Sequence, residues 1–171
     1  YILNSENEYS INVNYNQTST IDIQNENKKG NLEITKVDKE NSSITLANVG
    51  FELYNEDSNV LIGTYYTDED GKIEIKDLRI GNYKLKEIST NKWYNLAENQ
   101  DLQINWDETT KTIVEDELKK GQIRIIKIDK EDKKIRIPNV TFEVQDVNGN
   151  ILEKITTDEN GEALTSKYPL R

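Results

Sequence analysis

Hydrophobic and polar residues alternate along most of this chain, in short runs rich in β-branched and aromatic side chains. Asn, Asp and Gly separate these runs, and none of them has the 3.6-residue period of an amphipathic helix. In the middle of the chain the alternation predicts seven strands, at 31–38, 49–55, 59–66, 72–77, 82–89, 101–106 and 111–116. Seven short strands in about 90 residues are typical of a sandwich of two sheets, so we expect an all-β, immunoglobulin-like fold.

The same pattern of strands occurs more than once, with a period of 91 residues. The segment GNLEITKVDKE at 30–40 returns as GQIRIIKIDKE at 121–131. Upstream, TIDIQNENKKG at 20–30 aligns with KTIVEDELKKG at 111–121. Self-similarity at a fixed period is the signature of a tandem array, so we expect the chain to be an excerpt from one.

The period divides the chain into three parts. We expect these to be the end of one repeat, a complete repeat and the beginning of a third, at 1–30, 31–120 and 121–171. The complete repeat holds all seven predicted strands. The last repeat lacks the strands that would cover its apolar face, so we expect 122–171 to be less stable than the middle repeat.

Composition narrows the classes of function. Charged residues make up 32% of the chain and the net charge is −10, spread along the strands rather than gathered in blocks. No apolar run approaches the roughly 20 residues of a membrane span, so we expect no membrane as a partner. Because the net charge is negative, we do not expect nucleic acid as a partner either. The chain has no cysteine and no histidine, which excludes disulfides, thiolate nucleophiles and histidine-dependent triads. We therefore expect no cofactor, no metal and no enzymatic turnover.

Three charged residues fall on faces that the alternation turns toward the core. They are Lys36, Glu87 and Asp116, and each follows an apolar residue two positions earlier on its predicted strand. Their equivalents in the partial repeats are Lys127 and, on an inward face of its own, Asn25. Such residues can form an ordinary buried ion pair, and a lysine at a strand end can reach water. The alternative is a reactive set, in which a buried amine meets a buried carboxyl group.

The order of motifs around these residues resembles Cna B-type domains, also called SpaA-type or prealbumin-like domains. The motifs are G-x-L-x-I-x-K-V-D from Gly30, GFEL from Gly50, TDEDGKI from Thr67, L-x-x-G-x-Y-x-L-x-E from Leu78, and an Asp five residues before Gly121. Domains of this family form the stalks of Gram-positive adhesins and pilins. The resemblance implies a prealbumin-like sandwich that acts as a structural stalk or spacer. It also implies an extracellular protein anchored to the cell wall, with neighbouring repeats of the same chain as partners.

In that family, the lysine of the first strand commonly forms an intramolecular isopeptide bond with an Asn or Asp of the last strand, assisted by a Glu between them. The resemblance therefore implies a bond between Lys36 and Asp116, with Glu87 as the catalytic proton relay. Asn is the more usual acceptor, and Asn25 keeps it in the preceding repeat. We expect Asn25 and Lys127 to remain unpaired. The chemistry is reasonable, because burial disfavours the charged forms of both an amine and a carboxyl group.

Two other features of the sequence are compatible with functions other than a structural spacer. The segment TDEDGK fits part of an EF-hand loop, but the first and twelfth ligand positions fall on Tyr66 and Asp77, so a tight hairpin turn is the better interpretation. The rival function is an adhesive module that binds a host extracellular-matrix protein or glycan through Trp93, Tyr94 and Trp106. An exposed cluster of these aromatics would favour binding, and its absence would favour a spacer.

Overall fold

The computed structural model describes residues 1–2 and 8–170, and within them it contains strands and turns but no helix. None of these elements is therefore a helix of the length and hydrophobicity needed to cross a membrane. The chain forms two compact units, Tyr1–Glu117 and Leu118–Arg171. The all-β fold class is thus confirmed.

The first unit contains the seven predicted strands. They are β1 (Lys29–Asp38), β2 (Gly50–Asn55), β3 (Val60–Tyr66), β4 (Lys72–Arg79), β5 (Gly81–Ser89), β6 (Gln100–Ile104) and β7 (Thr109–Asp116). Each boundary lies within two residues of the one that the alternation predicts. The agreement follows from the period-2 pattern, which places one face of each strand in the core and the other in water.

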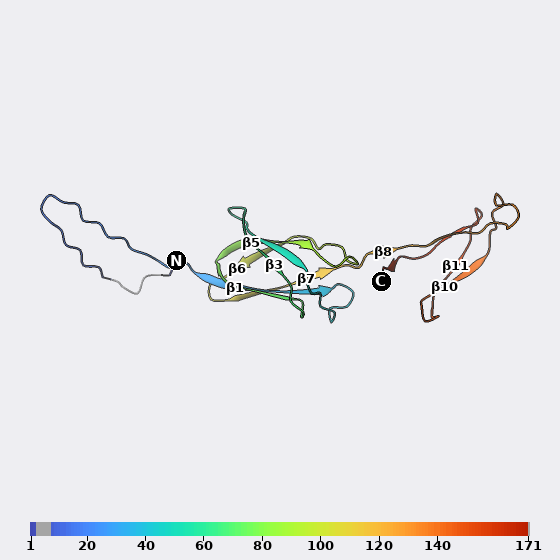
Figure 1. The fold of residues 1–171 in the computed structure, drawn as a ribbon, viewed down its shortest axis with the longest axis horizontal. Helices are drawn as coiled ribbons and strands as arrows, with labels where there is room; N and C mark the ends of the chain where they lie inside the picture. Colours follow the sequence, from blue (N-terminus) through green and yellow to red (C-terminus); the bar gives the residue numbers. More distant parts are fainter. Residues whose placement is uncertain (3–7, 171) are drawn as a thin grey trace. The chain divides into compact units, whose positions relative to one another are not determined.

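The seven strands form two sheets, in the orders β4-β1-β7 and β3-β2-β5-β6. Figure 1 shows the two layers, with β1 and β7 in one and β5 and β6 in the other. The first and last strands of the repeat are neighbours and run parallel, in a register from Asn31 opposite Thr109 to Asp38 opposite Asp116. This two-sheet arrangement confirms the predicted sandwich.

The core of the sandwich lies between the two sheets. Its largest fully buried apolar side chains come from both layers and are Leu32, Ile34, Val49, Phe51, Leu53, Tyr83, Leu85, Ile104 and Val114. These residues hold the strands together by apolar burial. Lys36 and Asp116 lie in the same interior with no exposed surface.

The TDEDG segment forms a tight turn, but not the predicted hairpin. The flanking strands β3 and β4 belong to different sheets, so the turn carries the chain from one layer to the other. The Asp68 carboxylate accepts hydrogen bonds from the amides of Asp70 and Lys72. Gly71 has a φ of +72°, and a Cβ there would lie 2.9 Å from the carbonyl oxygen of Lys36. A glycine is therefore required where this turn packs against β1.

The second unit repeats the backbone geometry of the first. Its strands are β8 (Lys120–Gly121), β9 (Arg124–Ile126), β10 (Thr141–Gln145), β11 (Ile151–Thr156), β12 (Glu162–Leu164) and β13 (Tyr168–Pro169), paired as β10-β11, β12-β9 and β13-β8. Gly161 has a φ of +67°, and its carbonyl accepts the Lys127 amide at 2.8 Å, as the Gly71 carbonyl accepts that of Lys36. The turn after β11 thus matches the turn after β3.

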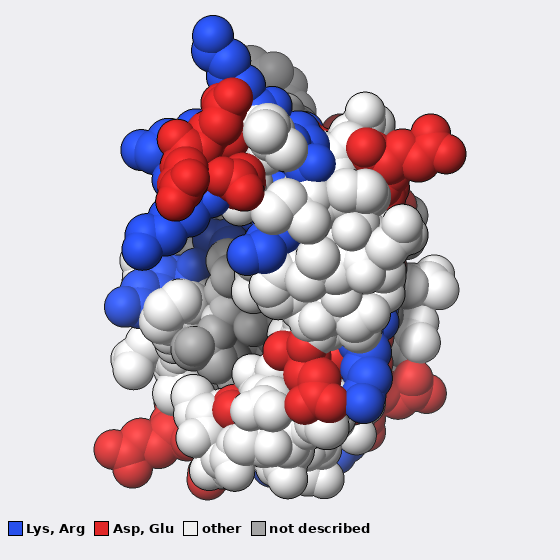
Figure 2. All heavy atoms as spheres, turned by 90° about the vertical axis from the view of Figure 1, so that its right-hand side faces the viewer, with Lys and Arg blue, Asp and Glu red and all other residues white. Residues whose placement is uncertain are grey.

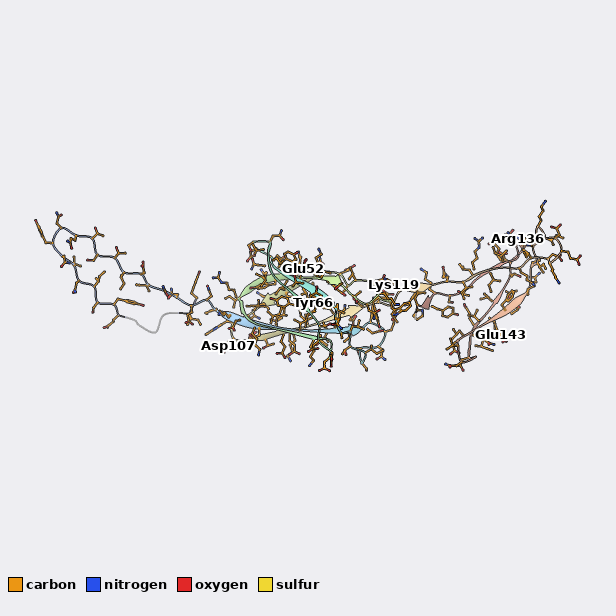
Figure 3. All side chains as sticks on the ribbon, in the orientation of Figure 1. Glu52, Tyr66, Asp107, Lys119, Arg136 and Glu143 are labelled. Carbon is orange, nitrogen blue, oxygen red and sulfur yellow. The ribbon has the colours of Figure 1, made fainter. Side chains whose placement is uncertain are left out.

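The N-terminal segment repeats the turn between β6 and β7. The hydroxyl of Ser19 donates to the carbonyl of Asn12, and 91 residues later the hydroxyl of Thr110 donates to the carbonyl of Gln103. Each turn also contains a residue with a positive φ angle, 56° at Asn16 and 58° at Asp107. Figure 3 labels Asp107. The period of 91 residues therefore appears in the backbone geometry of the N-terminal segment and of the second unit.

Candidate functional site

The structure brings Lys36, Glu87 and Asp116 together between the two sheets. Lys36 lies on β1 and Asp116 at the end of β7, next to each other in one sheet, while Glu87 comes from β5 in the facing sheet. The side chains of all three are completely buried. The alternation along each strand explains this, because each residue follows buried apolar neighbours on the inward face.

The amine of Lys36 contacts both carboxyl groups. Its Nζ donates to Oε2 of Glu87 at 3.0 Å and to Oδ1 of Asp116 in a close direct contact. The Phe51 ring lies on another side of the amine, with its centroid 5.9 Å from Nζ. The amine and the two carboxyl groups are therefore in direct contact, and all three side chains are buried from solvent.

Neighbouring groups fix the orientation of the two carboxyl groups. The amide of Ala97 donates to Oε2 of Glu87 at 3.0 Å, and the hydroxyl of Thr90 donates to Oδ2 of Asp116 at 2.6 Å. Oε1 of Glu87 is buried and has no hydrogen-bond partner among the described residues. A buried carboxylate oxygen without a donor is costly, whereas a protonated carboxyl group carries less charge into the core.

Burial raises the pKa of the Glu87 carboxyl group. Desolvation is the largest cause, and the negative charge of Asp116 adds to it. The Ala97 amide and the Lys36 amine act in the opposite direction, because they stabilise the carboxylate. The environment of Glu87 thus favours a retained proton on its carboxyl group, as a general acid requires.

Backbone contacts hold Lys36 in place. Its amide donates to the carbonyl of Gly71 at 2.8 Å, and its carbonyl accepts the amide of Leu46 at 3.0 Å. Two residues further along β1, the Asp38 carboxylate is also buried, where it accepts the Tyr94 hydroxyl at 2.8 Å. The strand that carries the amine is therefore anchored on both sides of the site.

Sequence reasoning did not find four of these contributors, which are Asp38, Thr90, Tyr94 and Ala97. Asp38 could have been found, since it lies two residues after Lys36 on the same inward face. The other three lie in the segment between β5 and β6, where no periodic pattern marks the direction of a side chain. Tyr94 was assigned to a possible binding surface, whereas it packs in the core.

Asn25 and Lys127, which the period of 91 residues aligns with Asp116 and Lys36, do not join such a cluster. Asn25 is exposed, and so are Ile21 and Ile23, which the alternation places on its face. No strand forms over residues 8–25. Lys127 is half-buried beside its own turn, and residues 121–170 contain no strand equivalent to β5 and hence no counterpart of Glu87.

The aromatic residues do not form one exposed cluster. Tyr94 is buried, whereas Trp93 and Trp106 are exposed and lie before and after β6 in the sequence. Each tryptophan contacts a lysine, Lys92 at 4.5 Å from the ring centroid of Trp93 and Lys28 at 4.3 Å from that of Trp106. Cation–π packing accounts for both exposed rings.

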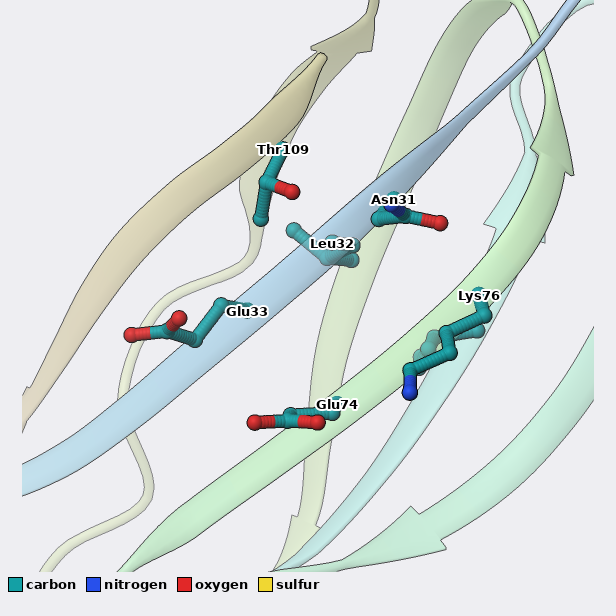
Figure 4. Close-up of a pocket in the computed structure, with 7 residues that line it drawn as sticks. Asn31, Leu32, Glu33, Glu74, Lys76 and Thr109 are labelled. Carbon is teal, nitrogen blue, oxygen red and sulfur yellow. The ribbon is translucent and has the colours of Figure 1, made fainter. Parts of the chain in front are cut away.

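Several hollows lie on the surface of the described residues, with volumes of about 130–520 Å³. One of them, of about 130 Å³, lies on the sheet that contains β1 and is lined by residues that include Glu33, Glu74 and Lys76, which are drawn in Figure 4. Three others, of about 310–520 Å³, fall within the roughly 300–1,000 Å³ that ligand pockets usually occupy. Figure 2 shows exposed side chains of both charge signs, blue for Lys and Arg and red for Asp and Glu. Among the described residues, no group of three His, Cys, Asp or Glu side chains could hold a metal ion.

Comparisons with known proteins agree with this architecture. Residues 30–118 and 121–170 each match the model of the SpaA family, a prealbumin-like fold domain. Among solved structures, the chain is similar to the Bacillus anthracis TIE protein, with 34% identity and a TM-score of 0.64 over 86% of this chain and 28% of that one.

Two further similar structures are pilins. GBS52, the minor pilin of the Gram-positive pathogen Streptococcus agalactiae, is 26% identical over 54% of this chain and 46% of that one, with a TM-score of 0.47. A streptococcal ancillary pilin is 21% identical over 83% of this chain and 51% of that one, with a TM-score of 0.49. The chain thus spans about half or less of the length of these three proteins.

No curated protein matches the chain. The family match covers most of the chain and confirms the resemblance drawn from the motifs. This chain therefore belongs to the family of SpaA-type domains with a prealbumin-like fold.

Proposed function

We propose that this chain is a structural stalk or spacer of a Gram-positive surface adhesin or pilin, in which an isopeptide bond between Lys36 and Asp116 closes the complete repeat. The observation that carries this proposal is the buried contact of an amine with two carboxyl groups, between the first and last strands. The chain also belongs to the family of SpaA-type domains, which have a prealbumin-like fold. In this role the parent protein is extracellular and anchored to the cell wall, and the partners of the repeat are its neighbours in the same chain.

The reaction is an internal condensation. The uncharged amine of Lys36 attacks the carboxyl carbon of Asp116, which forms the C–N bond and a tetrahedral intermediate. Glu87 gives a proton to the departing hydroxyl group, so that the C–O bond breaks and one water leaves. The resulting Glu87 carboxylate then takes the surplus proton from the nitrogen. One amine and one carboxylic acid thus become one amide and one water, and Glu87 ends as it began.

The site supplies the two conditions that this reaction needs. Contact between the amine and the acceptor replaces a bimolecular encounter, which can be worth roughly 7–11 kcal/mol of the barrier when reacting groups are well oriented. Burial also disfavours charge on Glu87, the proposed proton donor, because charge is costly in a low-dielectric interior. The raised pKa of Glu87 supports its role as the proton donor.

The bond would act on the strands that bear load. β1 and β7 are parallel neighbours, so a force applied at the two ends of the repeat shears one strand along the other. Lys36 and Asp116 are 80 residues apart in sequence. By analogy with a disulfide that closes such a loop, the bond would stabilise the repeat by about 4.5 kcal/mol. It would also keep those residues from extending under force.

Single-molecule force spectroscopy on the full chain tests this function. An extended chain spans about 3.5 Å per residue, so release of an 80-residue loop adds about 280 Å of length. We expect no such lengthening in the natural chain and the full lengthening in the Lys36→Met variant, which has no amine to react. If the natural chain also lengthens by about 280 Å, it is not a locked spacer.

A further inference from the structure

The hydroxyl group of Thr90 contacts the proposed acceptor on the side away from the amine. Its Oγ1 donates to Oδ2 of Asp116 at 2.6 Å, while Oδ1 of the same carboxyl group faces Lys36. The same amine also contacts Oε2 of Glu87, at 3.0 Å. The two oxygens of Asp116 therefore have different neighbours. These neighbours can determine which oxygen leaves as water and which one stays in the amide.

The Lys36 amine connects the proton donor to one of the two oxygens, because it contacts both Oε2 of Glu87 and Oδ1 of Asp116. An oxygen that leaves as water must take up protons, and this connection links Oδ1 to Glu87. The oxygen that stays becomes negatively charged in the tetrahedral intermediate and then forms the amide carbonyl. A fixed hydrogen-bond donor at that oxygen lowers the barrier, as the donors of an oxyanion hole do.

We propose that Thr90 is this donor, so that Oδ2 of Asp116 is kept as the amide oxygen and Oδ1 departs in the water molecule. The inference rests on the proposed bond between Lys36 and Asp116. It assigns to Thr90 a role in the reaction that the alternation along the strands does not indicate, because Thr90 follows the end of β5. The step adds no reactant, and the Thr90 proton stays on its own oxygen throughout.

The segment that begins at Thr90 is tied to the strands of the site. The Asn95 amide donates to the carbonyl of Glu117, directly after the acceptor, at 2.9 Å. The Tyr94 hydroxyl donates to Asp38 on the strand that carries the amine. The Ala97 amide contacts Glu87. A donor on a segment held at three points is preorganised, which is the condition for stabilising charge as it develops.

The same arrangement serves an Asn acceptor. If position 116 were Asn, the Thr90 hydroxyl would donate to the amide oxygen, and the NH₂ group would take the place of Oδ1 beside Lys36. The NH₂ group would then leave as ammonia. Thr90 is therefore expected to assist the reaction of both an Asp and an Asn acceptor. A role that depends on the negative charge of Asp116 would assist only the Asp acceptor.

The test compares rates of bond formation in chains that have never folded before the measurement. Each chain is synthesised without cells, stopped in denaturant and then diluted into native buffer, and the fraction that has lost one water is followed by intact mass. The removal of one oxyanion donor usually slows a reaction by about 10²–10³-fold. We expect Thr90→Ala and Thr90→Val to slow bond formation by a factor of this order, and Thr90→Ser to restore a rate close to that of the natural chain.

Two controls separate chemistry from folding. Ser89→Ala removes a neighbouring exposed hydroxyl and should leave the rate unchanged. In a Lys36→Met background, which cannot react, Thr90→Ala should leave a cooperatively folded chain. Bond formation in folded Thr90→Ala at the natural rate would overturn the role of Thr90. A natural chain that keeps its full mass would instead overturn the proposed bond itself, so the two failures are distinguishable.

Discussion

Replacement of Glu87 with Gln removes the proposed proton relay while it changes the shape of the site very little. The amide oxygen of Gln can still accept the hydrogen bonds that Lys36 and Ala97 donate to Oε2. The amide cannot give up a proton and take it back. General acid and base catalysis contributes about 10²–10⁴-fold to a rate, so bond formation in Glu87→Gln should slow by a factor of this order.

The thermal stability of the variant should fall with the loss of the bond. Closure of a loop of 80 residues is worth about 4.5 kcal/mol in the disulfide model. For a domain of this size, each kcal/mol shifts Tm by about 4–8 °C. We therefore expect unlinked Glu87→Gln to melt about 20–35 °C below the natural chain.

Intact mass and differential scanning calorimetry on the same samples measure both effects. Glu74→Gln is the matched control, because Glu74 is an exposed glutamate on β4 that faces away from the core. This control should lose one water and melt like the natural chain. If Glu87→Gln links as fast as the natural chain, Glu87 is not the proton relay. If it stays unlinked but melts at the natural temperature, the bond does not contribute the stability worked out above.

Three further predictions follow from the same site. Asp116→Asn should form the bond with loss of ammonia instead of water, and intact mass distinguishes the two; an unlinked variant would contradict the reaction proposed. In Lys36→Met, which cannot link, stability should fall as pH rises from about 4.5, because the raised pKa of Glu87 lets the folded state bind a proton more tightly than the unfolded state. Calorimetry across pH should show that this dependence of stability on pH disappears when Glu87→Gln is added to Lys36→Met. If the dependence persists, a group other than Glu87 causes it. Residues 31–120 should unfold cooperatively when produced alone. In the full chain, residues 122–171 should exchange amide protons faster than residues 31–120, and Lys127 should react with amine reagents. Equal protection of both regions would show that another segment completes the last repeat.

The strands of the sandwich and the burial of its three charged residues could be predicted because both depend on the same period of two. Ile34 and Lys36 share a face of β1, and Leu85 and Glu87 share a face of β5, so a charged residue on the apolar face is visible in the sequence. The family resemblance then supplied a chemical reason for the charges. The register of β1 against β7 was implied only by that resemblance, because alternation does not determine which strands pair.

The turn after β3 and the contacts of Thr90 could not be predicted in the same way. A turn of Asp and Gly residues forms equally well within a hairpin and between two sheets, so TDEDG did not determine where β4 pairs. Thr90 and Ala97 lie outside the strands, where the direction of a side chain depends on tertiary contacts. Trp93 and Trp106 similarly show no pattern that distinguishes packing on a lysine from binding to a ligand.

The intact mass of the folded natural chain tests the central claim most directly. We predict a mass one water below that of the sequence, and a cross-linked peptide pair after proteolysis that joins Lys36 to Asp116. The Lys36→Met variant, measured alongside, should keep the full mass of its own sequence. A natural chain that folds and yet keeps its full sequence mass would contradict the account, because Lys36, Glu87 and Asp116 would then form only a buried ion pair.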